Sequence, residues 1–311
     1  MTKKESPWDE RKKSVMRVRS KVLHEARSWL TEHGFYEVQG PVIMPAIAEW
    51  KSYFRLRYYD LDAVLSQGLG PYAKVFIANL GRTYAISPSF RAEMVNGDRR
   101  LTEYWLIEAG IPHGNLEAIM EIQERLVTHI CQHLPIDIGE TTIQKAIARL
   151  KRIRSPFPRL TYSKAIDLLR DEGYDVQWGA TLEYRHEKAL SVQFKTPFFI
   201  SRFPISIETY SYRNCPENPM LTLSVDLLAP EGYGELSSGG EPAIGEEMLK
   251  KMKEDEMNLD EQKWYASIEE MGSTFHSGFA MGVERLIQWL CSLEHITDAS
   301  AFPRLHNCLY P

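Results

Sequence analysis

Apolar residues recur at helical spacing close to the start of the chain. Val15, Val18 and Val22 fall on one face of a helix predicted over residues 14–33, and Gly34 stands where that helix should end. Charged residues lie between these apolar positions. The pattern therefore indicates an amphipathic helix with one buried face.

Short runs of β-branched and aromatic residues predict strands in two parts of the chain. The first part holds runs at residues 42–44, 53–56 and 84–86, and strand-rich sequence returns over residues 195–225. Helices are predicted at residues 116–134, 162–171, 245–257 and 283–293. Thr161 or Ser163 is the candidate cap of the second of these helices. Runs of strands with helices inserted between them favour an α+β fold with an antiparallel sheet flanked by helices.

Length and charge narrow the organisation of the chain. Its 311 residues can bury a large core, and apolar patterning from residue 15 to residue 309 favours a single domain over residues 1–311. Residues 111–190 are interpreted as a helical insertion in that domain. The net charge is −5, and the two densest basic stretches, residues 11–21 and 149–154, are interpreted as solvated helix faces.

Cysteine usage and hydropathy indicate where the protein resides. The four cysteines are widely separated and show no spacing typical of zinc or disulfide frameworks. No stretch approaches the roughly 20 apolar residues that a membrane span needs, and no signal peptide is evident. We therefore expect a cytoplasmic protein without membrane contact. The cysteines are Cys131, Cys215, Cys291 and Cys308.

Two short strings place arginines where they can grip a polyphosphate. Arg91 lies in Phe-Arg-Ala-Glu at residues 90–93, and Arg285 closes Gly-Val-Glu-Arg at residues 282–285. Arginine stays charged at cellular pH, and its planar guanidinium binds phosphate in a bidentate manner. Neither arginine is near a glycine-rich Walker loop. The sequence therefore predicts binding of a nucleoside triphosphate without a P-loop.

These strings resemble motifs 2 and 3 of the class II aminoacyl-tRNA synthetases, and the surrounding sequence is most similar to the asparaginyl and aspartyl branch. Motif 1, a long helix followed by a strand that ends in proline, has its counterpart at residues 22–41. Ordered matches extend over roughly residues 14–311. The later ones lie at residues 196–200, 226–235, 264–265, 276–279 and 301–304.

The resemblance implies roles for five residues in activating a carboxylate with ATP. This reaction needs fixed cations around the phosphate oxygens. Arg91 would hold the α-phosphate and the carboxylate, and Arg285 would hold the γ-phosphate; these two are the predicted catalytic residues. Glu93 would read the adenine amino group. Arg99 or Arg100 would clamp the distal phosphates, although the family commonly has histidine where Arg100 stands.

The same resemblance implies a magnesium site. Glu235 and Ser238 stand three residues apart, as the metal ligands of the aspartyl relatives do, and Asp226 precedes them on a predicted strand. Magnesium prefers oxygen ligands, with phosphate and water completing its octahedron. The alternative is that Asp226 and Glu235 only accept hydrogen bonds from backbone amides in a turn.

The amino-acid pocket combines retained and altered residues. Glu49 and Glu108 match the carboxylates that read the α-ammonium group, and a buried carboxylate needs such a cationic partner. Pro242, however, stands where the synthetases place the arginine that pairs with the substrate side chain. Gly70 replaces a usual glutamine, and Ala73 replaces a lysine of the aspartyl branch.

These changes make aspartate a doubtful substrate unless another cation takes the role of the missing arginine, because one bidentate arginine contact is worth about 1.5–3 kcal/mol. Lys74 is a candidate reader displaced by one position. Gln67 and Ser238 are also predicted substrate contacts. His276 is a substrate contact or a satisfied core histidine. The other cations considered are Arg55, Arg57 and Arg202.

The sequence leaves no room before the motif 1 helix for the β-barrel that reads the anticodon in the relatives, so we expect a freestanding catalytic core. The leading hypothesis is ATP- and Mg²⁺-dependent adenylation of an amino acid, with transfer to ammonia, another amine or a carrier, as in related asparagine synthetases. Transfer to a tRNA or a tRNA-like acceptor is possible but less favoured. An inactive regulatory relative is the third hypothesis. The resemblance of residues 22–41 to the class II dimer interface predicts a homodimer.

Overall fold

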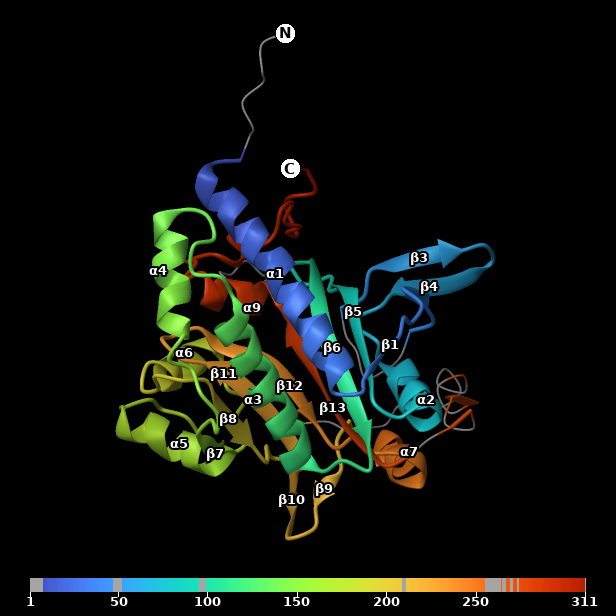
Figure 1. Cartoon of the computed structure of the whole chain (residues 1–311). Helices are drawn as coiled ribbons and strands as arrows, with labels where there is room; N and C mark the ends of the chain where they lie inside the picture. The colour runs from blue at the N-terminus through green and yellow to red at the C-terminus, as the bar shows by residue number, and fades with distance from the viewer. Residues whose placement is uncertain are drawn as a thin grey trace.

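The computed structural model describes residues 8–46, 52–94, 99–208, 211–254, 264, 267–268, 271–272 and 274–310. It is a mixed α+β structure in which helices cover a large sheet, so the predicted fold class is confirmed (Figure 1). Two smaller sheets lie beside the large one. One contains β2 (Ile43–Met44), β4 (Leu61–Leu65) and β3 (Arg55–Tyr58), and the other contains β9 (Asn214–Cys215) and β10 (Asn218–Thr222).

The main sheet has eight strands and is antiparallel through its centre. Among the described strands, parallel pairing occurs only at its two edges, where the first and last strands join their neighbours. The strands, in spatial order, are β1 (Tyr36–Glu37), β5 (Thr83–Phe90), β6 (Glu103–Pro112), β13 (His276–Gly282), β12 (Gly234–Gly240), β11 (Ser224–Ala229), β8 (Phe198–Ser201) and β7 (Arg159–Thr161).

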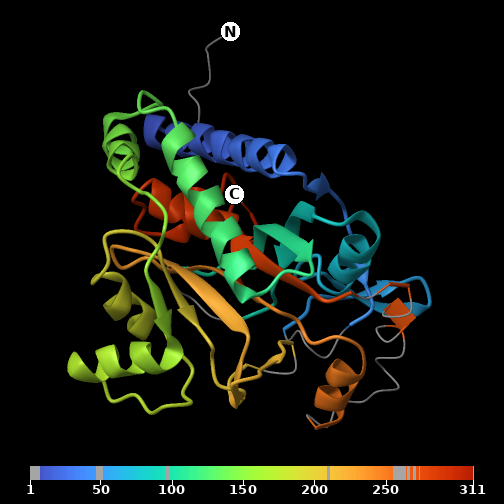
Figure 2. The same cartoon turned by 60° about the horizontal axis from the view of Figure 1, so that its bottom comes forward.

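Helices from both ends of the chain cover one face of this sheet (Figures 1 and 2). The helices of this layer are α1 (Glu10–Glu32), α3 (Leu116–His133), α4 (Thr141–Leu150) and α9 (Val283–Leu290). The other helical elements are α2 (Pro71–Leu80), α5 (Tyr162–Asp171), α6 (Tyr184–Ser191), α7 (Gly245–Glu254) and the 3-10 turn η1 (Ile296–Ala299). The expected end of α7 at residue 257 lies outside the described residues.

Alternation along the central strands divides the core from the opposite face of the sheet. On β6, Ile107 is fully buried in the core against the helix layer, whereas the next residue, Glu108, borders a cavity. On β13, Met281 is likewise buried in the core, and its neighbour Ala280 borders a cavity. One face of the sheet therefore supports the fold, and the other is available for chemistry.

Local signals set several helix boundaries. The Asp9 side chain accepts a hydrogen bond from the backbone N–H of Lys12 at the start of α1, and Thr161 does the same for Lys164 at the start of α5. The predicted bounds and cap of α5 are thereby confirmed. Residues 111–190, the expected helical insertion, hold α3 to α6 and also β7, which joins the edge of the main sheet.

The interpretation of residues 149–154 as a solvated face was wrong for Lys151. Its Nζ donates hydrogen bonds to the carbonyl oxygens of Cys131, Gln132 and Leu134, at 3.3, 2.6 and 2.6 Å. These carbonyls close α3, where backbone acceptors lack partners within the helix. The lysine therefore caps a helix.

The interpretation of residues 149–154 as a solvated face was also wrong for Arg149. Its guanidinium donates to the carbonyls of Trp289 and Leu290 at the end of α9, at 2.5 and 3.1 Å, and pairs with Glu231. In the first basic stretch, Arg19 forms an ion pair with the buried carboxylate of Glu284 at 2.7 Å. These side chains join elements of the core instead of facing only solvent.

The cysteines are all free thiols, and three of the four are buried. Cys131, Cys215 and Cys291 are buried free thiols, and Cys308 is an exposed one. Among the described residues, no helix combines the length and apolar character that crossing a bilayer requires.

Candidate active site

Two adjoining cavities lie on the face of the sheet opposite the helix layer. The first, of about 420 Å³, has four arginines and three glutamates in its wall, and we call it the charged cavity. The second, of about 210 Å³, is mostly apolar, and we call it the apolar cavity. Tyr212, Ser238 and Ala280 border both. A ligand can therefore extend from one cavity into the other.

The sheet brings most of the predicted nucleotide and metal residues together in the charged cavity. They come from the loop between β4 and α2, the loop between β5 and β6, β12 and the first turn of α9, which are far apart in the sequence. The predicted residues that border this cavity are Gln67, Arg91, Glu93, Arg99, Arg100, Glu235, Ser238 and Arg285.

The start of α9 is fixed on two sides. The Glu284 carboxylate accepts the backbone N–H of Trp105 on β6 at 2.9 Å and pairs with Arg19 of α1. The next residue, Arg285, reaches back to β12, where its Nη1 lies 2.9 Å from Oε2 of Glu235. The helix layer thus holds the arginine at a defined place beside the sheet.

The three arginines of the motif 2 region differ in their freedom. Arg99 is buried, pairs with Glu187 at 2.8 Å and donates to the backbone carbonyl of Glu235. Arg91 and Arg100 are more exposed, and both contact the carboxylate of Glu93. Arg99 is therefore anchored to β12 and α6, while Arg91 and Arg100 can exchange their carboxylate partner for a phosphate.

Acidic side chains are close to one another where the magnesium site is predicted. Burial alone would raise the pKa of Glu235, but Arg285 and Arg99 hold the pKa of that carboxyl below its usual range. Burial and the charges of Glu235 and Glu208 raise the pKa of Asp226 well above its usual range. Burial and Glu235 likewise raise the pKa of Glu208 to about 7.

Such a cluster of acids fits a divalent cation. Asp226 lies opposite Ser238 in the β11–β12 register, and the two side chains are hydrogen bonded. With Glu235 they offer carboxylate and hydroxyl oxygens, the ligand type that Mg²⁺ prefers. A cation among them would relieve the repulsion that raises the pKa of Asp226.

Glu108, in the wall of the apolar cavity, is held by hydrogen bonds from neighbouring groups. Its two carboxylate oxygens accept the Leu69 N–H at 2.9 and 2.8 Å, and the Ser87 hydroxyl lies at 3.4 Å. Burial raises its pKa to about 7, although these hydrogen bonds act in the opposite direction. A positively charged ligand would lower that pKa again by stabilising the carboxylate.

The wall of the apolar cavity includes the altered positions. Pro242 borders it, as do Gly70 and Ala73, so the replaced residues do face this space. Lys74 is also in the wall and is 5% exposed, with Nζ 3.7 Å from the sulfur of Met248. A lysine thus occupies the cavity wall that Pro242 also borders.

His276 borders the same cavity, and its Nδ1 is 2.7 Å from the carbonyl oxygen of Thr274. This hydrogen bond orients the ring. The remaining wall of the cavity is built largely from apolar side chains, Leu69, Ile77, Ala243, Met248 and Phe279 among them.

Some predicted contacts lie elsewhere. The Arg202 guanidinium contacts Cys215 Sγ at 2.9 Å and Glu217 at 3.4 Å, and Arg202 borders neither cavity. Arg57 pairs with Asp62 on the exposed β3–β4 hairpin. Glu49 lies outside the described residues.

Other residues of the site were missed by the sequence analysis. Tyr212 and Tyr104 border the charged cavity, Glu187 binds Arg99 from α6, and Glu208 joins the acidic cluster. Tyr104 lies in the motif 2 string but was given no role, and the other three belong to no short motif. Tyr104 follows the motif 2 loop on β6, where alternation with the buried Ile107 could have placed it on the cavity face.

Comparison with known proteins gives consistent matches over nearly the whole chain. A family model described as tRNA synthetases class II (D, K and N) matches residues 8–306. An asparagine–tRNA ligase of Thermococcus gammatolerans is 36% identical over 302 residues, which cover 96% of this chain and 70% of that protein.

Solved structures give the same result. The asparaginyl-tRNA synthetase of Pyrococcus horikoshii complexed with asparaginyl-adenylate is similar with a TM-score of 0.89 and 34% identity, over 97% of this chain and 70% of that one. The Entamoeba histolytica asparaginyl-tRNA synthetase in complex with asparaginyl-adenylate gives a TM-score of 0.88 and 30% identity, over 96% and 69%.

Proposed function

Because this chain belongs to the class II tRNA synthetases of the D, K and N type, we propose that it joins an amino acid to AMP and then transfers the aminoacyl group to a tRNA. It is an ATP-dependent, AMP-forming ligase whose cofactors are ATP and Mg²⁺. The observation that carries the proposal is that the two cavities share part of their walls. Arg91 and Arg285 border one, and Glu108 borders the other.

In the proposed first step, a carboxylate oxygen of the amino acid attacks the α-phosphorus and pyrophosphate leaves with the electron pair of the broken P–O bond. Arg91 would hold the α-phosphate and the attacking carboxylate near the junction of the cavities. Arg285 would release Glu235 and hold the γ-phosphate, so that the two arginines bend the triphosphate between them. Fixed cations of this kind need no reorganisation as charge develops.

Asp226, Glu235 and Ser238 would hold Mg²⁺, whose charge neutralises phosphate oxygens when it is bound. Glu93 is proposed to accept a hydrogen bond from the adenine amino group after Arg91 and Arg100 have moved from Glu93 to the phosphates. Arg99 keeps the motif 2 region on β12 through its contact with the Glu235 carbonyl.

The apolar cavity is proposed to hold the amino acid. Glu108, together with Glu49, would bind its ammonium group. Pro242 cannot pair with a side-chain carboxylate, and the wall near it is mostly apolar. We therefore propose an amino acid other than plain aspartate, whose side chain lies close to Lys74 and His276.

The names of the relatives favour tRNA as the acceptor of the aminoacyl group. They are named as asparagine–tRNA ligases, so the expectation that a tRNA acceptor is less favoured than a small amine finds no support in the comparisons. Ammonia or another amine remains the second candidate from the sequence, because the adenylate would react with any nucleophile that reaches it.

The test is a screen of amino acids for ATP–pyrophosphate exchange, followed by acceptor assays with tRNA and with ammonium on the best substrate. We expect exchange with one amino acid to exceed that with aspartate at least about tenfold. Pro242→Arg should improve aspartate relative to that amino acid. If aspartate proves best and Pro242→Arg does not improve it, the proposed specificity is wrong, whereas absence of exchange with any amino acid contradicts the activity itself.

We also propose a homodimer that buries the edge of the main sheet. β1 is only two residues long, no strand among the described residues pairs with its outer edge, and Tyr36 on it is 62% exposed. Light scattering at micromolar concentration should give twice the chain mass. Tyr36→Asp should shift the protein to a monomer, whereas Tyr59→Asp on the β3–β4 hairpin should not. A fully active wild-type monomer would contradict this proposal.

A further inference from the structure

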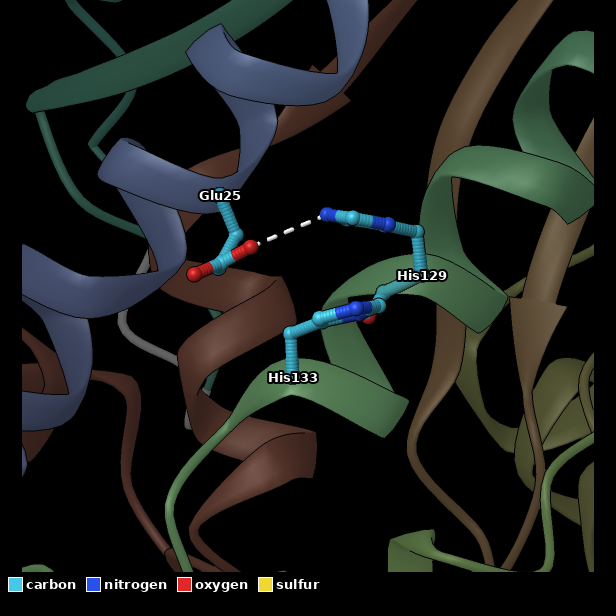
Figure 3. Close-up of side chains that lie close together, drawn as sticks. All are labelled: Glu25, His129 and His133. Carbon is cyan, nitrogen blue, oxygen red and sulfur yellow. Dashed lines mark hydrogen bonds and ion pairs between the residues drawn. The ribbon is translucent and has the colours of Figure 1, made fainter.

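Three side chains with metal-ligating atoms meet where α1 packs on α3 (Figure 3). Glu25 comes from α1, and His129 and His133 come from α3. None of them borders the charged or the apolar cavity. The cluster therefore has no part in the proposed reaction and needs its own explanation.

The geometry of the cluster suits chelation. His129 and His133 are four residues apart, so both rings extend from the same face of α3. Their ring centroids are 3.9 Å apart, and His129 Nε2 lies 2.9 Å from Glu25 Oε2. One ligand atom from each of the three residues lies within 4.8 Å of the others. Zinc bonds of 2.0–2.1 Å place tetrahedral ligand atoms about 3.4 Å apart, so modest side-chain rotation closes the site.

Neighbouring groups already orient these ligands. His133 Nδ1 lies 2.8 Å from the carbonyl oxygen of His129, which can only accept, so this nitrogen is the donor and in the neutral ring the lone pair is on Nε2. Lys21 binds the other oxygen of Glu25, at 2.6 Å, and leaves Oε2 facing His129. Hydrogen bonds of this kind commonly fix the tautomer of histidines and the orientation of carboxylates at metal sites.

We propose that Glu25, His129 and His133 form a binding site for a divalent transition metal such as Zn²⁺, with water completing its coordination. Two imidazoles and one carboxylate suit zinc and its neighbours, whereas Mg²⁺ prefers an all-oxygen set. Binding replaces the proton shared by His129 and Glu25. The metal joins α1 to α3 through residues 104 positions apart in the chain.

The test is calorimetric titration of tag-free, chelator-treated protein with Zn²⁺ in the presence of millimolar Mg²⁺, which occupies the oxygen site. We expect one Zn²⁺ per chain for the wild type. His133→Ala, a change at an exposed position, should weaken binding at least about 100-fold. His24→Ala, at an exposed histidine beside Glu25, should bind as the wild type does. Zn²⁺ should also raise the unfolding temperature of the wild type more than that of His133→Ala.

Cys308 is an exposed thiol that could take Zn²⁺ instead, so Cys308→Ser serves as a second control. Unchanged binding in Cys308→Ser supports the site at α1 and α3. Equal affinity in the wild type and His133→Ala overturns the proposal, as does a wild type that binds no Zn²⁺ at micromolar concentration. In either case the three residues form only a hydrogen-bonded contact between helices. The outcome is independent of the proposed reaction, because it is read from binding and unfolding.

Discussion

Arg91→Ala and Arg285→Ala should each slow adenylate formation at least about 30-fold, which corresponds to about 2 kcal/mol of transition-state stabilisation. The two guanidinium groups border one cavity and are proposed to hold opposite ends of the triphosphate. Each supplies a charge that is already in place when pyrophosphate begins to leave. The measurement is amino-acid-dependent ATP–pyrophosphate exchange at saturating ATP and Mg²⁺.

The two variants differ in their risk to the fold. The Arg91 side chain is 43% exposed, and its Nε lies as far as 3.6 Å from Oε1 of Glu93, so its removal should leave the structure intact. Arg285 pairs with Glu235 at 2.9 Å, so its variant needs a thermal unfolding check. Arg57→Ala, which breaks an exposed ion pair with Asp62, is the matched control and should retain full exchange. Exchange that survives in both Arg91→Ala and Arg285→Ala would remove the central claim of the proposed mechanism.

Helix α5 and strand β7 show how much of the fold could be predicted. The apolar spacing of α5 and its Thr161 cap are local features, so residues 162–171 were identified as a helix with the bounds that the structure has. β7 directly precedes it but is three residues long and pairs with β8, about 40 residues further on. A strand that depends on so distant a partner leaves almost no pattern in its own sequence.

The same division applies to the candidate site. Short motifs around Arg91 and Arg285 made these residues recognisable, and the fold places them in one cavity. The partner of Arg99 was not predictable, because Glu187 is 88 residues away on α6. Arg202 was a candidate on charge alone, but its guanidinium is held by Cys215 and Glu217.

The interpretation of the two basic stretches as solvated helix faces was wrong for a related reason. Charge and helical spacing favoured solvated faces, yet Lys151 and Arg149 bind carbonyl oxygens at the ends of other helices. Free carbonyls arise only once those helices have formed and packed together. Likewise, Glu25 and His129 are on different helices, so no spacing in the sequence could reveal their contact.

Glu108→Gln should raise the Michaelis constant for the amino acid about 30-fold or more, and that for ATP only slightly. The Glu108 carboxylate is bound by neutral donors, the amides of Leu69 and Gly70 and the Ser87 hydroxyl. A substrate ammonium would therefore supply its charge partner. Glutamine keeps the size and one acceptor oxygen of the side chain but loses that charge. The measurement is exchange kinetics with each substrate varied in turn.

The pH profile shows whether the carboxylate acts through its charge. Burial raises the pKa of Glu108 to about 7, so in the free enzyme it is mostly ionised at pH 8 and mostly protonated at pH 6. Only the ionised form attracts an ammonium, so the Michaelis constant for the amino acid should rise about tenfold as pH falls from 8 to 6. Glu108→Gln should show a high, flat constant over this range. His276 borders the same cavity, so His276→Gln is the control variant and must keep the pH dependence. If the dependence disappears in His276→Gln and persists in Glu108→Gln, the histidine is the group that controls binding, and Glu108 has only a structural role in the cavity wall.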